Sequence, residues 1–263
     1  MKKSVIVLIV IVFRINCPAF SQVQTAIARK ESGFHIGISH IDLREESLNR
    51  AIHKGPGISG AIYLERVDPG SVRRFHLVLG SNFLKSDYEG EISSYLISGS
   101  ASFSYLRSLR IGNPLFSFHL GGNVRAGSAI EYFDNWDESH FYWITSYSLG
   151  ADFKFSYSFR RNSRISIEAD LPFLSLISRP PKNFLYTQSR PAIPDVLKNI
   201  NQDLKFQSLG SYRNFTIQLQ YSLRTAKKIV PNIFLRFSDM CLNREGQSQV
   251  KYYRQTIGLE FRF

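Results

Sequence analysis

The chain has 263 residues, of which 43% are hydrophobic and 14% aromatic, and its formal net charge at pH 7 is +12. A mean hydropathy of −0.15 is too polar for a bundle of membrane-spanning helices, and the length suffices for one sizeable domain. A basic balance of this size is also found in nucleic-acid-binding proteins, so the distribution of the charges along the chain matters.

The N-terminus has the features of an export signal. Lys2 and Lys3 precede an apolar run at residues 5–13, and Ala19 and Ser21 provide small residues for cleavage. That run is too short for a helix that spans a bilayer, and no later apolar run reaches about 18 residues. We therefore expect residues 1–21 to be a signal peptide and residues 22–263 to form the mature domain. Its one cysteine, Cys241, cannot form an internal disulfide.

The first part of the mature chain contains segments in which apolar and polar residues alternate. In the fourth of them, Ile97 and Phe103 alternate with Ser98 and Ser102. A period of two predicts β-strands that have one apolar face. The first five of these segments cover residues 34–42, 58–66, 74–85, 92–106 and 115–132.

The sixth segment, residues 141–159, has the most regular pattern. Large apolar residues such as Trp143, Phe153 and Phe155 alternate with small or polar ones such as Ser148 and Asp152. The segment is much longer than the ~5 to 6 residues usual for strands of soluble sheets. If the aromatic rings pointed inward, several such rows would have to pack into one lumen. We therefore expect the rings to face lipid and the small residues to face a wet interior.

Four further segments complete the pattern, at residues 165–176, 207–223, 233–237 and 253–263. The sequence thus predicts an all-β, transmembrane, antiparallel up-and-down β-barrel of about ten strands, although eight to twelve would fit. Tight connections at residues 67–71, 107–114, 160–164 and 224–231 alternate with mostly longer ones. This alternation predicts short periplasmic turns and longer extracellular loops. Basic residues, Arg74 and Arg164 among them, gather at the tight connections and acidic residues at the longer ones, so nucleic acid is not needed to explain the charge.

One long connection, residues 179–206, contains apolar residues at helical spacing. They are Ile193, Val196, Leu197, Ile200 and Leu204. This spacing predicts a short amphipathic helix that begins near Pro194 or Asp195. Such an extracellular loop could cap the mouth of the barrel or bind a partner.

The chain resembles bacterial outer-membrane β-barrel proteins. The export signal, the strand pattern and a last strand that ends in Phe261, Arg262 and Phe263 carry this resemblance. It implies a location in the outer membrane, contact with outer-membrane lipids, and recognition of Phe261 and Phe263 by the barrel-assembly machinery. The resemblance is to a class of proteins and assigns no functional family.

Several polar residues have the strand parity of the barrel interior. They include charges of both signs, and unpaired buried charges would be unfavourable. We interpret them as a paired network that fills a narrow lumen. The function expected on this basis is a non-catalytic structural, assembly-accessory or interaction role with an unidentified extracellular or periplasmic partner. The alternative is a narrow channel for small solutes. The predicted network consists of His119, Arg125, Asp152, Lys154, Glu168, Asp170, Arg236 and Glu260.

Two classes of outer-membrane enzyme have residue requirements that can be compared with this sequence. Omptin proteases are ten-stranded barrels that use acidic residues and a histidine near the extracellular rim. Here Asp134, Asp137, Glu138 and His140 offer the residue types without a motif. A lipid A deacylase-like site needs a lipid-facing serine and histidine. Ser128 and His40 have that parity but belong to distant strands. We therefore predict no catalytic residue, no metal site and no cofactor.

Overall fold

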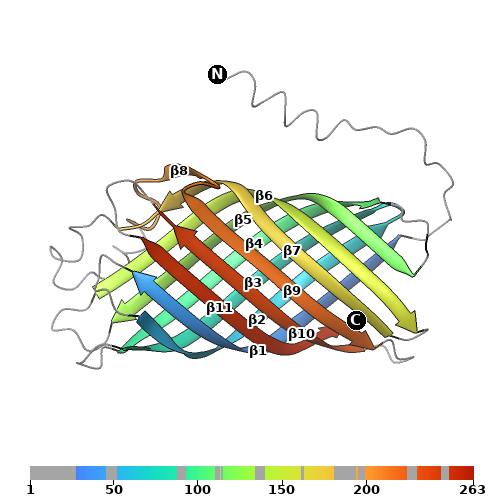
Figure 1. Ribbon diagram of the computed structural model, residues 1–263, viewed down its shortest axis with the longest axis horizontal. Helices are drawn as coiled ribbons and strands as arrows, with labels where there is room; N and C mark the ends of the chain where they lie inside the picture. Colours follow the sequence, from blue (N-terminus) through green and yellow to red (C-terminus); the bar gives the residue numbers. More distant parts are fainter. Residues whose placement is uncertain are drawn as a thin grey trace, which may run out of the picture.

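The computed structural model is a closed, antiparallel barrel of ten strands with one additional short strand outside it (Figure 1). It describes residues 28–45, 52–87, 93–109, 113, 115–133, 140–160, 163–180, 194, 199–223, 230–243 and 249–263. The strands are β1 Arg29–Glu45, β2 Ile52–Asp68, β3 Ser71–Ser86, β4 Ser93–Leu109, β5 Phe116–Phe133, β6 His140–Arg160, β7 Ser163–Ser178, β8 Lys205–Ser208, β9 Tyr212–Leu223, β10 Val230–Leu242 and β11 Val250–Arg262. The predicted ten-stranded up-and-down barrel is confirmed.

Consecutive strands are neighbours around the wall, and β1 closes the barrel against β11. Their register runs from Gly33 opposite Arg262 to Glu45 opposite Val250. The start of β1 and the end of β11 lie at the end of the barrel where β2 turns tightly into β3. We call this the turn end, and the opposite end the loop end. Among the described residues, no helix is long and apolar enough to cross a membrane.

A broad apolar band surrounds the outside of the barrel. Ile38 on β1 is 67% exposed and Ile58 on β2 is 68% exposed, although both are large aliphatic side chains. A soluble monomer rarely exposes a contiguous apolar surface of this extent, whereas lipid chains would cover it in a bilayer. The outward parity predicted for the long strands is thus the one that the barrel adopts.

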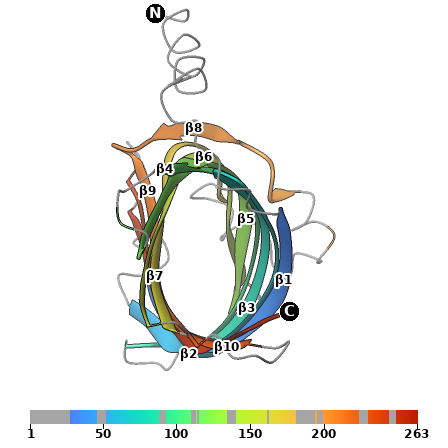
Figure 2. The ribbon, with the colours of Figure 1, turned by 90° about the vertical axis from the view of Figure 1, so that its right-hand side faces the viewer.

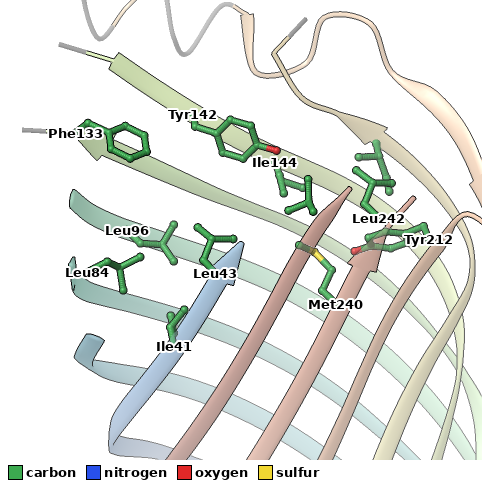
Figure 3. Close-up of a cluster of buried hydrophobic side chains, with 12 residues drawn as sticks. Ile41, Leu43, Leu84, Leu96, Phe133, Tyr142, Ile144, Tyr212, Met240 and Leu242 are labelled. Carbon is green, nitrogen blue, oxygen red and sulfur yellow. The ribbon is translucent and has the colours of Figure 1, made fainter. Parts of the chain in front are cut away.

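At the loop end the apolar residues lie on the inner face of the strands and the polar residues on the outer face. On β1, Ile41 and Leu43 are buried inside the barrel, whereas His40 and Asp42 lie outside and contact each other at 3.3 Å. The same change on other strands produces an apolar cluster within the lumen (Figure 3). The prediction of a polar lumen therefore fails at this end. The cluster consists of Ile41, Leu43, Leu84, Leu96, Phe133, Tyr142, Ile144, Ile177, Tyr212, Met240, Leu242 and Val250.

This inversion indicates that the strands continue beyond the bilayer into water, where an apolar face must turn inward. From Ile38 to the end of β1 at Glu45, a rise of about 3.3 Å per residue and a tilt of about 40° give an extension of about 18 Å. The extension explains why β10 continues to Leu242, whereas the alternating pattern predicted a strand that ends at residue 237.

The predicted eighth strand, residues 207–223, is wrong in one respect. A turn at residues 209–211 divides it into β8 and β9. β8 pairs with the loop end of β7 and lies outside the barrel wall (Figure 2). Nearby, the Tyr147 hydroxyl donates to Asn201 at 3.0 Å and Ser178 donates to the carbonyl of Gln202 at 2.6 Å. This part of the long connection thus lies against the outer wall of β6 and β7.

Two predictions fall mainly outside the described residues. These are the signal peptide, residues 1–21, and the short helix. Of the latter, Pro194 and Asn199 have helical backbone and residues 195–198 are not described.

Candidate functional site

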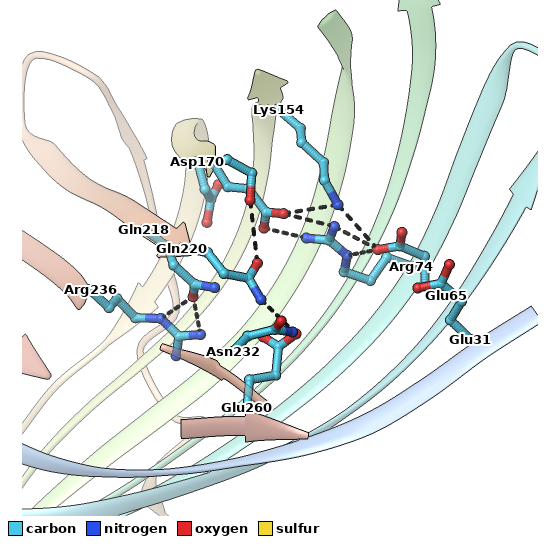
Figure 4. Close-up of polar contacts among 12 residues, drawn as sticks. Glu31, Glu65, Arg74, Lys154, Asp170, Gln218, Gln220, Asn232, Arg236 and Glu260 are labelled. Carbon is cyan, nitrogen blue, oxygen red and sulfur yellow. Dashed lines mark hydrogen bonds and ion pairs between the residues drawn. The ribbon is translucent and has the colours of Figure 1, made fainter. Parts of the chain in front are cut away.

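Ionic side chains from opposite walls meet inside the barrel towards its turn end (Figure 4). Arg74 on β3 donates to Glu65 on β2 at 2.7 Å and to both carboxylate oxygens of Glu168 on β7 at 2.6 and 3.1 Å. The Lys154 ammonium on β6 lies 3.0 Å from Glu168 and 3.6 Å from Glu65. Because β2 and β7 are five strands apart around a ten-stranded wall, these contacts cross the lumen. We call these four residues the ionic bridge.

Arg74 differs from the sequence-based expectation, which placed it with the basic residues of the turn end. β3 parity turns it inward together with His76, and its side chain is only 14% exposed. Its guanidinium can bind two carboxylates at once because its donors form a planar fork. Glu65 was not predicted as part of the network at all. It lies directly opposite Arg74 in the register of β2 and β3.

The other predicted lumen residues form further contacts or stay apart. Arg125 on β5 forms an ion pair with Asp170 on β7, and Asn123 also donates to Asp170. Asp152 lies opposite Asp170 in register, and none of the described ion pairs includes it. His119 lies on β5, and its buried Nδ1 has no hydrogen-bond partner among the described residues.

A second polar group lies at the turn end near the seam. Glu260 on β11 accepts hydrogen bonds from Gln220 at 2.8 Å, from Asn232 at 3.4 Å and from Arg262 at 2.6 Å. Arg262 also contacts Glu31 on β1 at 3.6 Å. Two polar layers therefore fill the lumen between the turn end and its middle.

The ring of Phe234 packs against two glycines at the seam between β1 and β11. Gly37 on β1 and Gly258 on β11 face each other in register, and the fully buried ring of Phe234 lies over them. A Cβ atom on Gly258 would lie 2.8 Å from that ring and 2.2 Å from the carbonyl oxygen of Ile36, so only glycine fits there. The ring of His35 adds a contact at 4.8 Å between centroids.

A chamber of about 170 Å³ lies between the ionic bridge and the apolar cluster. On β2 and β3 it is lined by Ser59 and Val78, which are farther from the turn end than Glu65 and Arg74. Its lining also includes three arginines, Arg125, Arg236 and Arg254. Of these, Arg254 did not stand out in the sequence, although its parity matches that of the inward Glu260.

Arg236 and Arg254 bind neutral partners. Arg236 donates twice to Gln218, at 2.9 and 2.5 Å. Arg254 donates to Ser98 at 2.8 Å and to Asn82 at 3.4 Å, and its buried Nε has no partner in the described part of the chain. None of the ion pairs found among the described residues includes Arg236 or Arg254.

A buried serine, histidine and glutamate meet at the loop end. His53 Nδ1 lies 3.2 Å from Glu131, and the Ser94 hydroxyl donates to the same carboxylate oxygen at 2.6 Å. In a hydrolase the imidazole must lie between the serine and the acid, so that it can accept the serine proton. Here the carboxylate takes the central place. The arrangement therefore serves structure rather than activation of Ser94.

The residues weighed for catalysis are not brought together in the described structure. Ser128 bonds Thr145 at 3.1 Å, while His40 lies four strands away on β1 beside Asp42. Asp134, Asp137 and Glu138 and the side chain of His140 lie outside the described residues. No group of three or more His, Cys, Asp or Glu side chains that could hold a metal ion occurs in the described ranges.

The C-terminal aromatic residues lie on the outer face of the seam. Phe261 stacks on Phe34 with 5.0 Å between ring centroids, and Phe263 lies 6.5 Å from the same ring. Phe263 remains 62% exposed. Both rings are thus accessible from the membrane side.

No model of a known protein family matches the sequence, and no curated protein matches it. Among solved structures, the outer-membrane protease OmpT from Escherichia coli superimposes with a TM-score of 0.56 at 9% identity, over 91% of this chain and 99% of that chain. Ail from Yersinia pestis gives 0.38 at 12% identity, over 89% and 99% of the two chains. Neisserial surface protein A gives 0.34 at 12% identity, over 90% and 100%. The chain has the fold of the bacterial outer-membrane β-barrel proteins.

Proposed function

We propose that this protein is a non-catalytic outer-membrane barrel that does not conduct solutes and acts as a structural or interaction protein. The observation that carries the proposal is the ionic bridge, because Arg74, Lys154 and Glu168 connect opposite walls of the lumen. A path for solutes along the barrel axis would have to pass through these contacts.

Burial of the interior side chains supports the same conclusion. Gln220 is 1% exposed, Glu260 4% and Lys154 5%. The wall of a water-filled channel would expose its polar residues to the lumen, as porins do. The burial therefore favours a filled interior over the alternative of a narrow channel.

Planar-bilayer recording tests this proposal directly. We expect the refolded mature chain to give no steady conductance. A variant in which Glu65, Arg74, Lys154 and Glu168 are all changed to serine removes the bridge without leaving an unpaired charge. Because the Glu260 group and the apolar cluster remain, we expect it to show brief openings rather than a steady conductance. The matched control changes the exposed pair Arg213 and Asp239 to serine and should remain silent. A steady open conductance of the unmodified protein would refute the proposal.

A hydrolase is the less favoured function, because the Ser94 hydroxyl bonds Glu131 rather than His53. Mass spectrometry of lipid A and phospholipids from deletion and overexpression strains would reveal an acyl hydrolase. Peptide cleavage at the surface of the same cells would reveal a protease. We expect neither.

A further inference from the structure

We propose that the chamber in the middle of the barrel binds a small organic carboxylate with an apolar body, of about the size of benzoate. The inference goes beyond a filled, non-conducting barrel, since it assigns a ligand class to the space that the side chains leave open. It rests on three properties of the chamber: two arginines that form no ion pair among the described residues, a lining that is polar on one side and apolar on the other, and its size.

The first property is the charge. Arg236 and Arg254 both line the chamber, and the hydrogen bonds that hold them go to an amide, a hydroxyl and a second amide. Each guanidinium also lies against a ring, Arg236 at 5.6 Å from Phe234 and Arg254 at 5.4 Å from Tyr252. These contacts orient the two cations without neutralising them. Partly buried positive charge is stabilised by an anion, and guanidinium groups match the two oxygens of a carboxylate.

The other cations of the lumen have carboxylate partners. Arg74 and Lys154 are bound by Glu65 and Glu168, and Arg125 is paired with Asp170. Among the described residues, carboxylates therefore pair with the cations of the ionic bridge and with Arg125, whereas Arg236 and Arg254 form no ion pair. A bound anion would supply the carboxylate partner that Arg236 and Arg254 lack among the described residues.

The second property is the polarity of the lining. The side of the chamber opposite the arginines is apolar. Leu43, Leu96, Ile144 and Met240 line it together with the ring of Tyr142, and all five belong to the apolar cluster of the loop end. An inorganic anion such as phosphate would leave these side chains in contact with water. A ligand that carries both a carboxylate and a ring or short alkyl chain would satisfy both halves.

The third property is size. Protein cavities of about 150 Å³ lined by aliphatic and aromatic side chains take up benzene. A chamber of about 170 Å³ therefore has room for one ring with a carboxylate attached, and no room for a long acyl chain within the same volume. The ionic bridge lies on the turn side of the chamber, so the ligand has to arrive from the loop end, past the side chains of the apolar cluster.

The experiment compares three probes on the refolded mature chain in detergent micelles. Binding of 4-fluorobenzoate and of its neutral analogue 4-fluorobenzamide is followed by ¹⁹F relaxation, with protein-free micelles as the blank, and acetate is used as a competitor. We expect saturable 1:1 binding of 4-fluorobenzoate, at least about tenfold weaker binding of the amide, and little displacement by acetate, because charge and ring both contribute.

Variants separate this site from adventitious uptake. Arg236→Gln and Arg254→Gln should each weaken 4-fluorobenzoate binding about tenfold, whereas Arg213→Gln, on the exposed outer face, should not change it. Ser100 on β4 also lines the chamber. Ser100→Phe would fill the chamber without changing its charge and should abolish binding, which tests the site even if an arginine variant fails to fold. A difference in gel migration between unheated and heated protein verifies folding of each variant.

The proposal is overturned by any of three results. These are no saturable binding of 4-fluorobenzoate up to about 10 mM, equal affinity for the acid and the amide, or an effect of Arg213→Gln as large as that of Arg254→Gln. A conducting barrel that still binds the carboxylate would refute the proposed closed lumen and leave the chamber site intact.

Discussion

Removal of the Glu168 charge tests whether the ionic bridge stabilises the barrel. The bridge contains two carboxylates and two cations, and Glu168 contacts both cations, Arg74 at 2.6 Å and Lys154 at 3.0 Å. In Glu168→Gln these two cations would share Glu65 alone, and the bridge would carry one uncompensated positive charge.

The size of the effect follows from burial. Loss of one partner from a buried ion pair destabilises proteins by about 3 to 5 kcal/mol. The side chain of Glu168 is 14% exposed, so we expect the lower limit, about 3 kcal/mol in the free energy of unfolding. The control is Asp239→Asn. Asp239 pairs with Arg213 on the outer surface, where the two side chains are 42% and 58% exposed, and such a pair contributes about 0 to 1 kcal/mol.

The assay is a reversible urea titration of folding into lipid vesicles, read from gel migration without heating. The further variant Arg74→Met, combined with Glu168→Gln, removes one charge of each sign. It should recover part of the loss, with a coupling energy of at least about 1.5 kcal/mol. The reasoning would be refuted if Glu168→Gln were no more destabilising than Asp239→Asn, or if the double variant showed no coupling.

Three further predictions concern packing and assembly. Phe234→Ala should lower the free energy of unfolding by about 3 kcal/mol, because it empties a fully buried position; a loss below about 1 kcal/mol would contradict this packing. Gly258→Ala places a Cβ against the Ile36 carbonyl and should reduce the folded yield from urea, whereas Gly210→Ala, which meets nothing within 4 Å, should not; equal yields would contradict the close approach. Phe263→Ser should slow insertion by a reconstituted barrel-assembly machinery and leave spontaneous folding into thin bilayers unchanged; unchanged rates in both assays would remove the assembly role.

The number of strands and the face of each strand that meets lipid could be predicted, because both depend on local alternation. A row such as Tyr147 and Leu149 against Ser146 and Ser148 determines which face meets lipid, whatever the rest of the chain does. The same parity placed Lys154 and Glu168 in the interior. For these features a single strand contains the whole signal.

Contacts across the lumen could not be predicted in this way. Whether Arg74 reaches Glu168 depends on the stagger and flattening of the closed sheet, which no single strand encodes. The apolar cluster, by contrast, could have been predicted, because the sequence of β1 contains a signal for it. Ile41 and Leu43 flank Asp42 with the opposite parity to Ile36 and Ile38, and a search for such reversals would have found the extension.

The reversal of parity on β1 also determines how deep the barrel sits. Sliding the barrel into the bilayer would carry Asp42 and the outward-facing Lys85 and Lys251 into hydrocarbon, at about 2 to 4 kcal/mol for each lysine that reached the midplane. Sliding it outward would expose Ile38 and Ile58 to water. The change from an apolar to a polar outer face on β1 thus lies at the surface of the bilayer and sets the height of the barrel above the membrane.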